Sequence, residues 1–232
     1  MKYLKALHQP KAIRQRQNRN KKWTRISYYA KQILNALKAG NDRYVENLSS
    51  TKKTPLSPPT LVKEHKPNAI ILGCSDARVP VELIFDQGLG DLFVIRVAGN
   101  VVAPSQIGSI EFAAEKFGTR LVVVLGHSHC GAVTACVEAL INPDQYYSPN
   151  LQSIVDRIRP SVLNLHEIAT ASGDDVDMDE LIERSVRANV GMSVSQIKYG
   201  SRILEDMVRQ GDLLVIGAEY DVATGKVHFL DD

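Results

Sequence analysis

The fold of this chain is constrained most by two predicted strands. One leads through a glycine into a cysteine, and the other leads through a glycine into a histidine. Residues 69–72 are all apolar and lead through a glycine into Cys74; residues 121–125 are rich in valine and lead through a glycine into His127. Short continuous apolar runs are typical of parallel strands buried on both faces. Since open α/β sheets bind ligands outside the carboxyl ends of their strands, both side chains are expected at a site.

The rest of the body alternates helix and strand patterns, which predicts an α/β fold with a central, mainly parallel sheet and flanking helices. An N-terminal helical arm precedes the sheet, and the last two strands form an antiparallel C-terminal edge around a turn at residues 223–225. Ser, Thr and Pro predict a loop over residues 49–59. Helices are expected over 29–47, 81–85, 106–117, 131–140, 150–170 and 179–209, and further strands over 92–97, 213–218 and 226–230.

The N-terminal segment is strongly basic. Residues 1–41 hold 11 of the 28 Lys and Arg residues and none of the 26 Asp and Glu residues. We therefore divide the chain into a basic extension, residues 1–28, and one body domain, residues 29–232. Such a charge block is a solvated tail, an arm on an acidic neighbour, or a docking or targeting segment. A charge run alone does not predict a nucleic-acid partner.

Composition excludes several classes of protein. No apolar run reaches the length of about 18 residues that a membrane-spanning helix needs, and the N-terminus has no apolar core of a secretory signal. The three cysteines, Cys74, Cys130 and Cys136, are too few and odd in number for a disulfide framework. They are typical of a reducing compartment, where cysteine beside histidine indicates a metal or catalytic site.

Cys74, His127 and Cys130 form a set of two thiolates and one imidazole. Three such ligands suit zinc and leave its fourth position open for chemistry. Neither motif contains two cysteines, so the spacing is not that of a zinc finger. The sequence therefore predicts Zn²⁺ as cofactor, held by residues from two separate strands.

Asp76 and Arg78 follow the first of these cysteines and have two possible arrangements. Asp76 could bind the metal directly and close the site. Alternatively, Arg78 could hold the carboxylate bidentately, leaving it to accept a hydrogen bond from a metal-bound water. We favour the second arrangement at working pH, with the first as a resting state.

At this point the sequence resembles a known family. Residues 74–80, Cys-Ser-Asp-Ala-Arg-Val-Pro, and residues 126–132, Gly-His-Ser-His-Cys-Gly-Ala, resemble the two-part signature of the β-class carbonic anhydrases. The segments 85–91 and 96–100 are also similar to that family, and the resemblance runs from about Tyr29 to the final strand. It implies the reversible hydration of CO2 to bicarbonate and a proton, by attack of a zinc-bound hydroxide on CO2.

The resemblance also implies roles for single residues. Cys74, His127 and Cys130 become the zinc ligands, and Asp76 and Arg78 the dyad that gates the fourth position and orients the hydroxide. Four further positions correspond to substrate contacts: the Gly131 backbone N–H, Phe93 and Phe112 of the CO2 pocket, and His65.

Two of these substrate positions carry qualifications. Phe112 falls where a neighbouring protomer commonly completes the pocket, so a homodimer or homotetramer is expected, with the N-terminal helix on the partner. His65 stands where many members carry a glutamine; it could donate a similar hydrogen bond, shuttle protons, or be a loop histidine without a role.

Other positions differ from the family's regulated members. A tryptophan commonly lies three residues before the first ligand, and this chain has Ile71, although Arg96 and Tyr220 match the accompanying positions. We therefore expect no allosteric bicarbonate site. The spacing His-x-x-Cys selects His127 and leaves His129 as a neighbour of the site or a surface residue; Cys136 is expected to be a buried structural thiol.

Two rival functions remain open at this stage. Hydrolases of CS2 or COS on the same scaffold share the zinc set, so the motifs do not separate them. A non-catalytic scaffold recruited through the basic extension is the other rival, and the intact set of five site residues argues against it. The expected location is the cytoplasm, or a CO2-fixing compartment or organelle.

Overall fold

The computed structural model describes residues 11–47, 65–142, 144–171 and 177–230, with only the backbone of residues 11–27 and 169. In chain order the elements are α1 (Lys11–Val45), β1 (Ala69–Gly73), α3 (Val81–Ile84), β2 (Leu92–Arg96), η1 (Ala98–Asn100), α4 (Pro104–Phe112), η2 (Ala113–Phe117), β3 (Leu121–His127), α5 (Gly131–Ile141), α6 (Pro149–Ala171), α7 (Met178–Tyr199), α8 (Arg202–Arg209), β4 (Leu214–Tyr220) and β5 (Val227–Phe229). None of the helices in these ranges has the length and apolarity needed to cross a membrane.

The five strands form one sheet in the order β2-β1-β3-β4-β5, in which only β5 runs antiparallel to its neighbour. This confirms the predicted fold class. The register pairs Gly73 at the end of β1 with Leu125 of β3, and His127 with Tyr220 of β4. The carboxyl ends of β1 and β3 therefore lie almost level, and the residues that follow them meet at one edge of the sheet.

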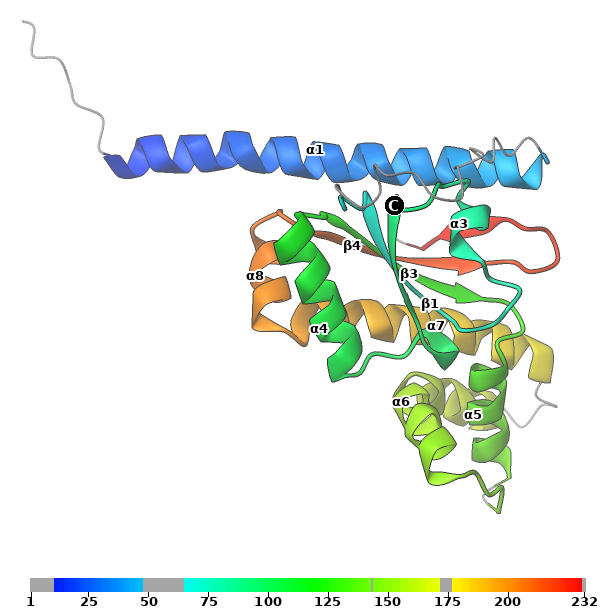
Figure 1. Cartoon of the computed structure of the whole chain (residues 1–232). Helices are drawn as coiled ribbons and strands as arrows, with labels where there is room; N and C mark the ends of the chain where they lie inside the picture. The colour runs from blue at the N-terminus through cyan, green and yellow to red at the C-terminus, as the bar shows by residue number, and fades with distance from the viewer. Residues whose placement is uncertain (1–10, 48–64, 143, 172–176, 231–232) are drawn as a thin grey trace, which may run out of the picture.

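Helices cover both faces of the sheet (Figure 1). On one face, Ala30, Leu34 and Leu37 of α1 pack with α3 against inward residues of β1, β3 and β4. On the other face, α4, α7 and α8 pack against the alternate residues of the same strands. Helices α5 and α6 build a third apolar cluster beyond the carboxyl edge, and this cluster includes Cys74 and Cys130. The predicted metal ligands therefore lie where the sheet meets the α5–α6 pair.

Helix α7 approaches β3 and β4 unusually closely because both strands carry a glycine there. A Cβ on Gly126 would lie 2.5 Å from Cγ2 of Val190, and one on Gly217 would lie 2.8 Å from its Cγ1. Real Cβ atoms do not reach such distances, so the two glycines set the separation between α7 and the sheet. Gly126 immediately precedes His127, which places this contact beside the candidate site.

Helix α1 begins earlier than predicted. It starts at Lys11 rather than Tyr29, so most of the basic extension is continuous with it. Residues 11–39 contain no glycine or proline and are rich in Lys, Arg, Gln and Ala, which all favour helices. The prediction relied on apolar spacing, and this segment has few apolar residues. Residues 1–10 of the extension and the predicted loop at 49–59 lie outside the described residues.

The predicted helix over 179–209 is two helices. A Cβ at Gly200 would lie 2.3 Å from the carbonyl oxygen of Gln196, and Ser201 caps α8 by accepting a hydrogen bond from the backbone N–H of Leu204 at 3.3 Å. A serine cap that begins a new helix is a local signal that the apolar pattern did not reveal.

Alanine substitutions at two glycines on this packing layer are expected to have opposite effects on stability. Gly126→Ala inserts a methyl group against buried Val190, which costs about 1–3 kcal/mol. Gly191→Ala lies next to that valine on α7, but nothing is within 4 Å of its added Cβ. Because alanine favours helix over glycine, this control is expected to gain about 0.5–1 kcal/mol. Urea denaturation of both variants measures the difference; equal effects would contradict the packing argument.

Candidate metal centre

Cys74, His127 and Cys130 meet at the carboxyl edge of the sheet. Their ligand atoms all lie within 4.8 Å of one another, and all three residues are buried. No other group of three or more such side chains that could hold a metal ion occurs among the described residues. Two soft sulfur atoms and one imidazole nitrogen at this spacing fit a zinc ion.

Backbone geometry brings the three ligands together. Cys74 follows the last residue of β1, and His127 is the last residue of β3. His129 adopts a left-handed conformation with φ of 55°, which turns the chain so that Cys130 can begin α5 as its N-cap. The side chain of His129 itself is exposed and outside the ligand group. His129 therefore shapes the turn, whereas its neighbours supply the ligand atoms.

The ring of His127 is oriented for binding through one nitrogen. Its Nδ1 lies 2.9 Å from the carbonyl oxygen of Ser128, which accepts a hydrogen bond when Nδ1 carries the proton. Its Nε2 is buried and makes no hydrogen bond to any described residue. In this tautomer Nε2 presents a lone pair to the two sulfurs, and a buried lone pair without a partner fits a metal ion.

The two thiols cannot both ionise easily without a cation. A hydrogen bond with Cys130 holds the pKa of the Cys74 thiol down at about 4, against the opposing effect of burial. The same hydrogen bond, together with burial, raises the pKa of the Cys130 thiol far above its usual range. Ionisation of one thiol therefore opposes ionisation of the other, and a divalent cation would supply the charge that stabilises both thiolates.

Asp76 is held by Arg78 at the border of this group. The Arg78 backbone N–H and Nε donate to Oδ1 at 2.9 and 3.0 Å, and Nη2 donates to Oδ2 at 2.7 Å. These hydrogen bonds hold the pKa of the Asp76 carboxyl well below its usual range. Oδ2 lies 3.9 Å from Nε2 of His127, so the carboxylate faces the ligand group while paired with Arg78.

Two further groups support Cys74. Arg96, at the end of β2, donates from Nε to the Cys74 carbonyl oxygen at 2.9 Å and from Nη2 to the Asp76 carbonyl oxygen at 2.6 Å. The backbone N–H of Gly99 donates to the Cys74 sulfur at 3.4 Å. Arg96 was expected only at a regulatory position, and Gly99 was not among the predicted site residues. Both residues lie in segment 96–100, whose similarity to the family could have indicated their role in the sequence.

The predicted substrate residues divide into two places. Gly131 is the first residue of α5 and is exposed directly beside Cys130. Phe93 lies in an aromatic group with Phe112, 6.4 Å between ring centroids, and with His65, at 6.3 Å. Phe117, which the sequence analysis missed, joins them: its ring centroid lies 4.3 Å from that of His65 and 5.3 Å from that of Phe112.

Within one chain this aromatic group is distant from the ligands. The sheet register places Phe93 beside Ile70, four residues before Cys74, which is roughly 13 Å along the strand. Phe112 is 52% exposed, unusually much for a large aromatic side chain. The chain thus has a partly exposed aromatic group that lies apart from its own metal ligands.

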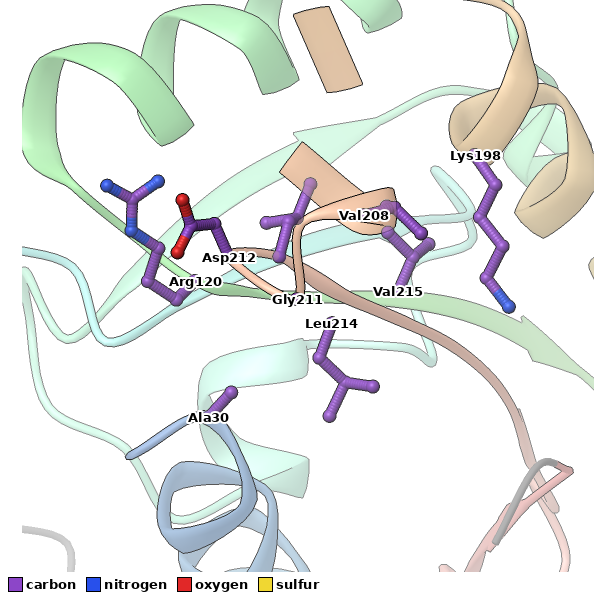
Figure 2. A pocket seen from close by; sticks show the side chains of 9 residues that line it. Ala30, Arg120, Lys198, Val208, Gly211, Asp212, Leu214 and Val215 are labelled. Carbon is purple, nitrogen blue, oxygen red and sulfur yellow. The ribbon is translucent and has the colours of Figure 1, made fainter. Parts of the chain in front are cut away.

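Two cavities lie near the sheet. One, of about 820 Å³, includes Ser128 and His129 but is otherwise lined mainly by carboxylates. Arg187 pairs with two of them, Glu183 and Glu219, and the remaining carboxylates leave the lining negatively charged. The other, of about 260 Å³, lies at the opposite edge of the sheet, where Figure 2 shows Arg120, Asp212 and Lys198 around aliphatic side chains. None of the predicted site residues lines this second cavity.

Comparisons with known proteins agree with this geometry. Residues 69–227 match the family described as carbonic anhydrase. The chain is 35% identical to carbonic anhydrase 2 of Mycobacterium tuberculosis, over 84% of this chain and 90% of the relative. It is 34% identical to a carbonic anhydrase of Mycolicibacterium smegmatis, over 83% and 89% of the two chains.

Solved structures show the same arrangement of elements. The β-carbonic anhydrase CafA of Aspergillus fumigatus superposes with a TM-score of 0.64 at 29% identity, covering 83% of this chain and 88% of that one. A tetrameric β-carbonic anhydrase of Sordaria macrospora has a TM-score of 0.66 at 23% identity, covering 84% and 94%. At that lower identity the likeness concerns the fold alone.

Replacing one sulfur ligand is expected to abolish metal binding, whereas replacing the third cysteine is not. Cys74→Ser removes a ligand atom and should reduce bound zinc from about one per chain to a small fraction of that. Cys136→Ser is the matched control, because Cys136 is also buried but lies outside the ligand group, and its sulfur donates to the Val155 carbonyl oxygen at 3.7 Å. Zinc content of the purified proteins is the measurement. Equal loss in both variants would mean that the fold, rather than a ligand, had been lost.

Proposed function

Because this chain belongs to the β-carbonic anhydrase family, we propose that it hydrates CO2 reversibly to bicarbonate and a proton, at a zinc ion held by Cys74, His127 and Cys130. The observation that carries the proposal is the buried group of three ligand atoms, within 4.8 Å of one another, at the carboxyl edge of the sheet. A zinc ion supplies Lewis-acid chemistry there, which makes water nucleophilic near neutral pH.

Asp76 and Arg78 act on the attacking water in this proposal. Oδ2 of Asp76 accepts a hydrogen bond from that water and so directs an oxygen lone pair toward CO2. Arg78 keeps the carboxylate ionised and occupies both of its oxygens, which favours orientation of the water over direct binding of Asp76 to the metal. Arg96 fixes the loop that carries Asp76 through two backbone carbonyl oxygens.

The helix α5 supplies a contact for the substrate. Gly131 is the first residue of this helix, and backbone N–H groups in the first turn of a helix have no partner within the helix. The N–H of Gly131 donates to an oxygen of CO2 or bicarbonate in our proposal. The absence of a side chain leaves the approach to Cys130 open, because nothing lies within 4 Å of a Cβ built at this position.

A second copy of the chain completes the substrate pocket. Phe93 lies roughly 13 Å along the strand from the level of Cys74. The ring of Phe112 lies 6.4 Å from that of Phe93 and is half exposed. We therefore place this aromatic surface, with His65 on its border, against the site of a neighbouring protomer. A homodimer or homotetramer satisfies this arrangement.

The basic extension, residues 1–28, has a separate role in our proposal. Its charge suits contact with a partner subunit or with an acidic assembly in the cytoplasm or a CO2-fixing compartment. The helix α1 continues from Lys11 through Tyr28 into the body, so residues 11–28 of the extension are helical and continuous with the domain.

Asp76→Asn is expected to impair hydration without releasing zinc. In Asp76 both carboxylate oxygens accept hydrogen bonds from Arg78. The asparagine amide has only one oxygen and cannot reproduce this arrangement while it accepts a hydrogen bond from the water, so kcat/KM should fall on the order of 10²-fold. Glu115→Gln makes the same chemical change on an exposed surface and serves as the control. Stopped-flow CO2 hydration, with zinc content measured in parallel, tests the role.

Three outcomes discriminate between functions. Rapid hydration by the unsubstituted protein that is lost in Asp76→Asn supports the proposal. Bound zinc without CO2 hydration, but with turnover of CS2 or COS, would reassign the site to a sulfur-substrate hydrolase. Unimpaired hydration by Asp76→Asn would remove Asp76 from the mechanism while leaving the metal centre in place.

A further inference from the structure

One buried face of α7 carries small polar residues where an apolar stripe is expected. Ser185, Asn189 and Ser193 follow one another at intervals of four residues, so they lie on the same side of the helix. Each is no more than 2% exposed. Helices that pack against a sheet normally bury apolar side chains, and buried polar groups are retained where they bond a specific partner.

Two of the three residues bond the backbone of η1. The side-chain N–H of Asn189 donates to the carbonyl oxygen of Gly99 at 2.8 Å, and the hydroxyl of Ser193 donates to that of Asn100 at 3.1 Å. These contacts join segments about 90 residues apart in the sequence. The hydroxyl of Ser185, in contrast, makes no hydrogen bond to a described residue.

The turn that they hold is strained. Both of its last residues have left-handed backbones, with φ of 67° at Gly99 and 44° at Asn100. Glycine adopts this conformation freely, and asparagine tolerates it better than most residues, so the strain is confined to Asn100, where the surrounding contacts impose it. A Cβ at Gly99 would also lie 2.8 Å from Ile158 of α6, so the turn fits tightly between α6 and α7.

The strained turn aims one N–H group at the metal centre. The Gly99 N–H donates to the sulfur of Cys74 at 3.4 Å. The carbonyl oxygen of the same residue accepts the hydrogen bond from Asn189 of α7. Hydrogen bonds to a ligand atom orient it and tune the charge that it donates to the metal. Asn189 therefore holds, by its carbonyl oxygen, the same residue whose N–H contacts the ligand sulfur.

We propose that Asn189 and Ser193 are positioning residues of the metal centre, which act through the strained Gly99–Asn100 turn to hold an N–H group against the Cys74 sulfur. This inference rests on the proposed zinc site and extends it to a helix that contributes no ligand. Asn189 has the larger effect, because it bonds the carbonyl oxygen of the same residue whose N–H reaches the sulfur. Ser193 fixes the following residue and has a smaller effect.

Zinc affinity tests the proposal independently of activity. We expect Asn189→Ala to weaken zinc binding about 10- to 100-fold, the range found for partners of metal ligands, and Ser193→Ala to weaken it less. Ser185→Ala removes the same group as Ser193→Ala from the same face of the same helix, but breaks no hydrogen bond to a described residue, and should leave affinity unchanged. Competition with a chromophoric chelator measures all four proteins.

A spectroscopic measurement separates positioning from simple anchoring of α7. With cobalt in place of zinc, the thiolate-to-cobalt charge-transfer band reports the charge on the ligand sulfurs. We expect this band to shift in Asn189→Ala and to stay unchanged in Ser185→Ala. Urea denaturation of the metal-free proteins shows how much stability each variant loses; should Asn189→Ala fail to fold, Ser193→Ala gives the same test at smaller amplitude.

The outcomes are distinguishable. Lower stability with unchanged zinc affinity and an unchanged cobalt band would overturn the proposal, and Asn189 and Ser193 would then be anchors of α7 only. An equal effect of Ser185→Ala and Ser193→Ala would also overturn it. If the unsubstituted protein bound no zinc, the proposed function itself would be wrong and this inference would end with it.

Discussion

The close packing of α7 against the carboxyl ends of β3 and β4 is the contact on which the metal centre depends. Gly126 and Gly217 permit it, because a methyl group at either position would collide with Val190. The same approach lets Asn189 and Ser193 reach the η1 turn, from which an N–H group contacts the Cys74 sulfur. A change in the position of this helix would therefore affect Cys74 through the η1 backbone. It would affect His127 through Gly126, the residue that precedes it.

The electrostatics of the centre favour a bound cation. Burial and their mutual hydrogen bond oppose the ionisation of both thiols at once, and Nε2 of His127 is buried without a hydrogen bond to any described residue. Asp76 adds a negative charge at the border, but Arg78 compensates it through three hydrogen bonds. A divalent ion would compensate the remaining charge of the thiolates. The arrangement of Asp76 leaves that ion available to a small molecule rather than enclosing it.

The substrate side of the site is less complete than the metal side within one chain. The three metal ligands, the Asp76 carboxylate and the first turn of α5 come together within a single chain. The aromatic group of Phe93 and Phe112 lies apart from them, with Phe93 roughly 13 Å along the strand from the level of Cys74. Large exposed aromatic side chains such as Phe112 are typical of surfaces that become buried on association. This division supports the proposal that a second copy of the chain completes the pocket.

The sequence by itself determined the succession of helices and strands along the chain and the apolar runs that become β1 and β3. It also determined which residues gather at the ends of these two strands. Residue type and periodicity are local properties, and Cys74, His127 and Cys130 could be singled out from them. The start of α1 at Lys11 was missed, because helix propensity rather than apolar spacing specifies that segment. Only the tertiary structure decided how the strands align, that Phe117 joins His65, and that Asn189 and Ser193 support Cys74 through η1. These contacts join segments far apart in the chain, and their geometry is set by the packing of helices on a sheet rather than by any local pattern.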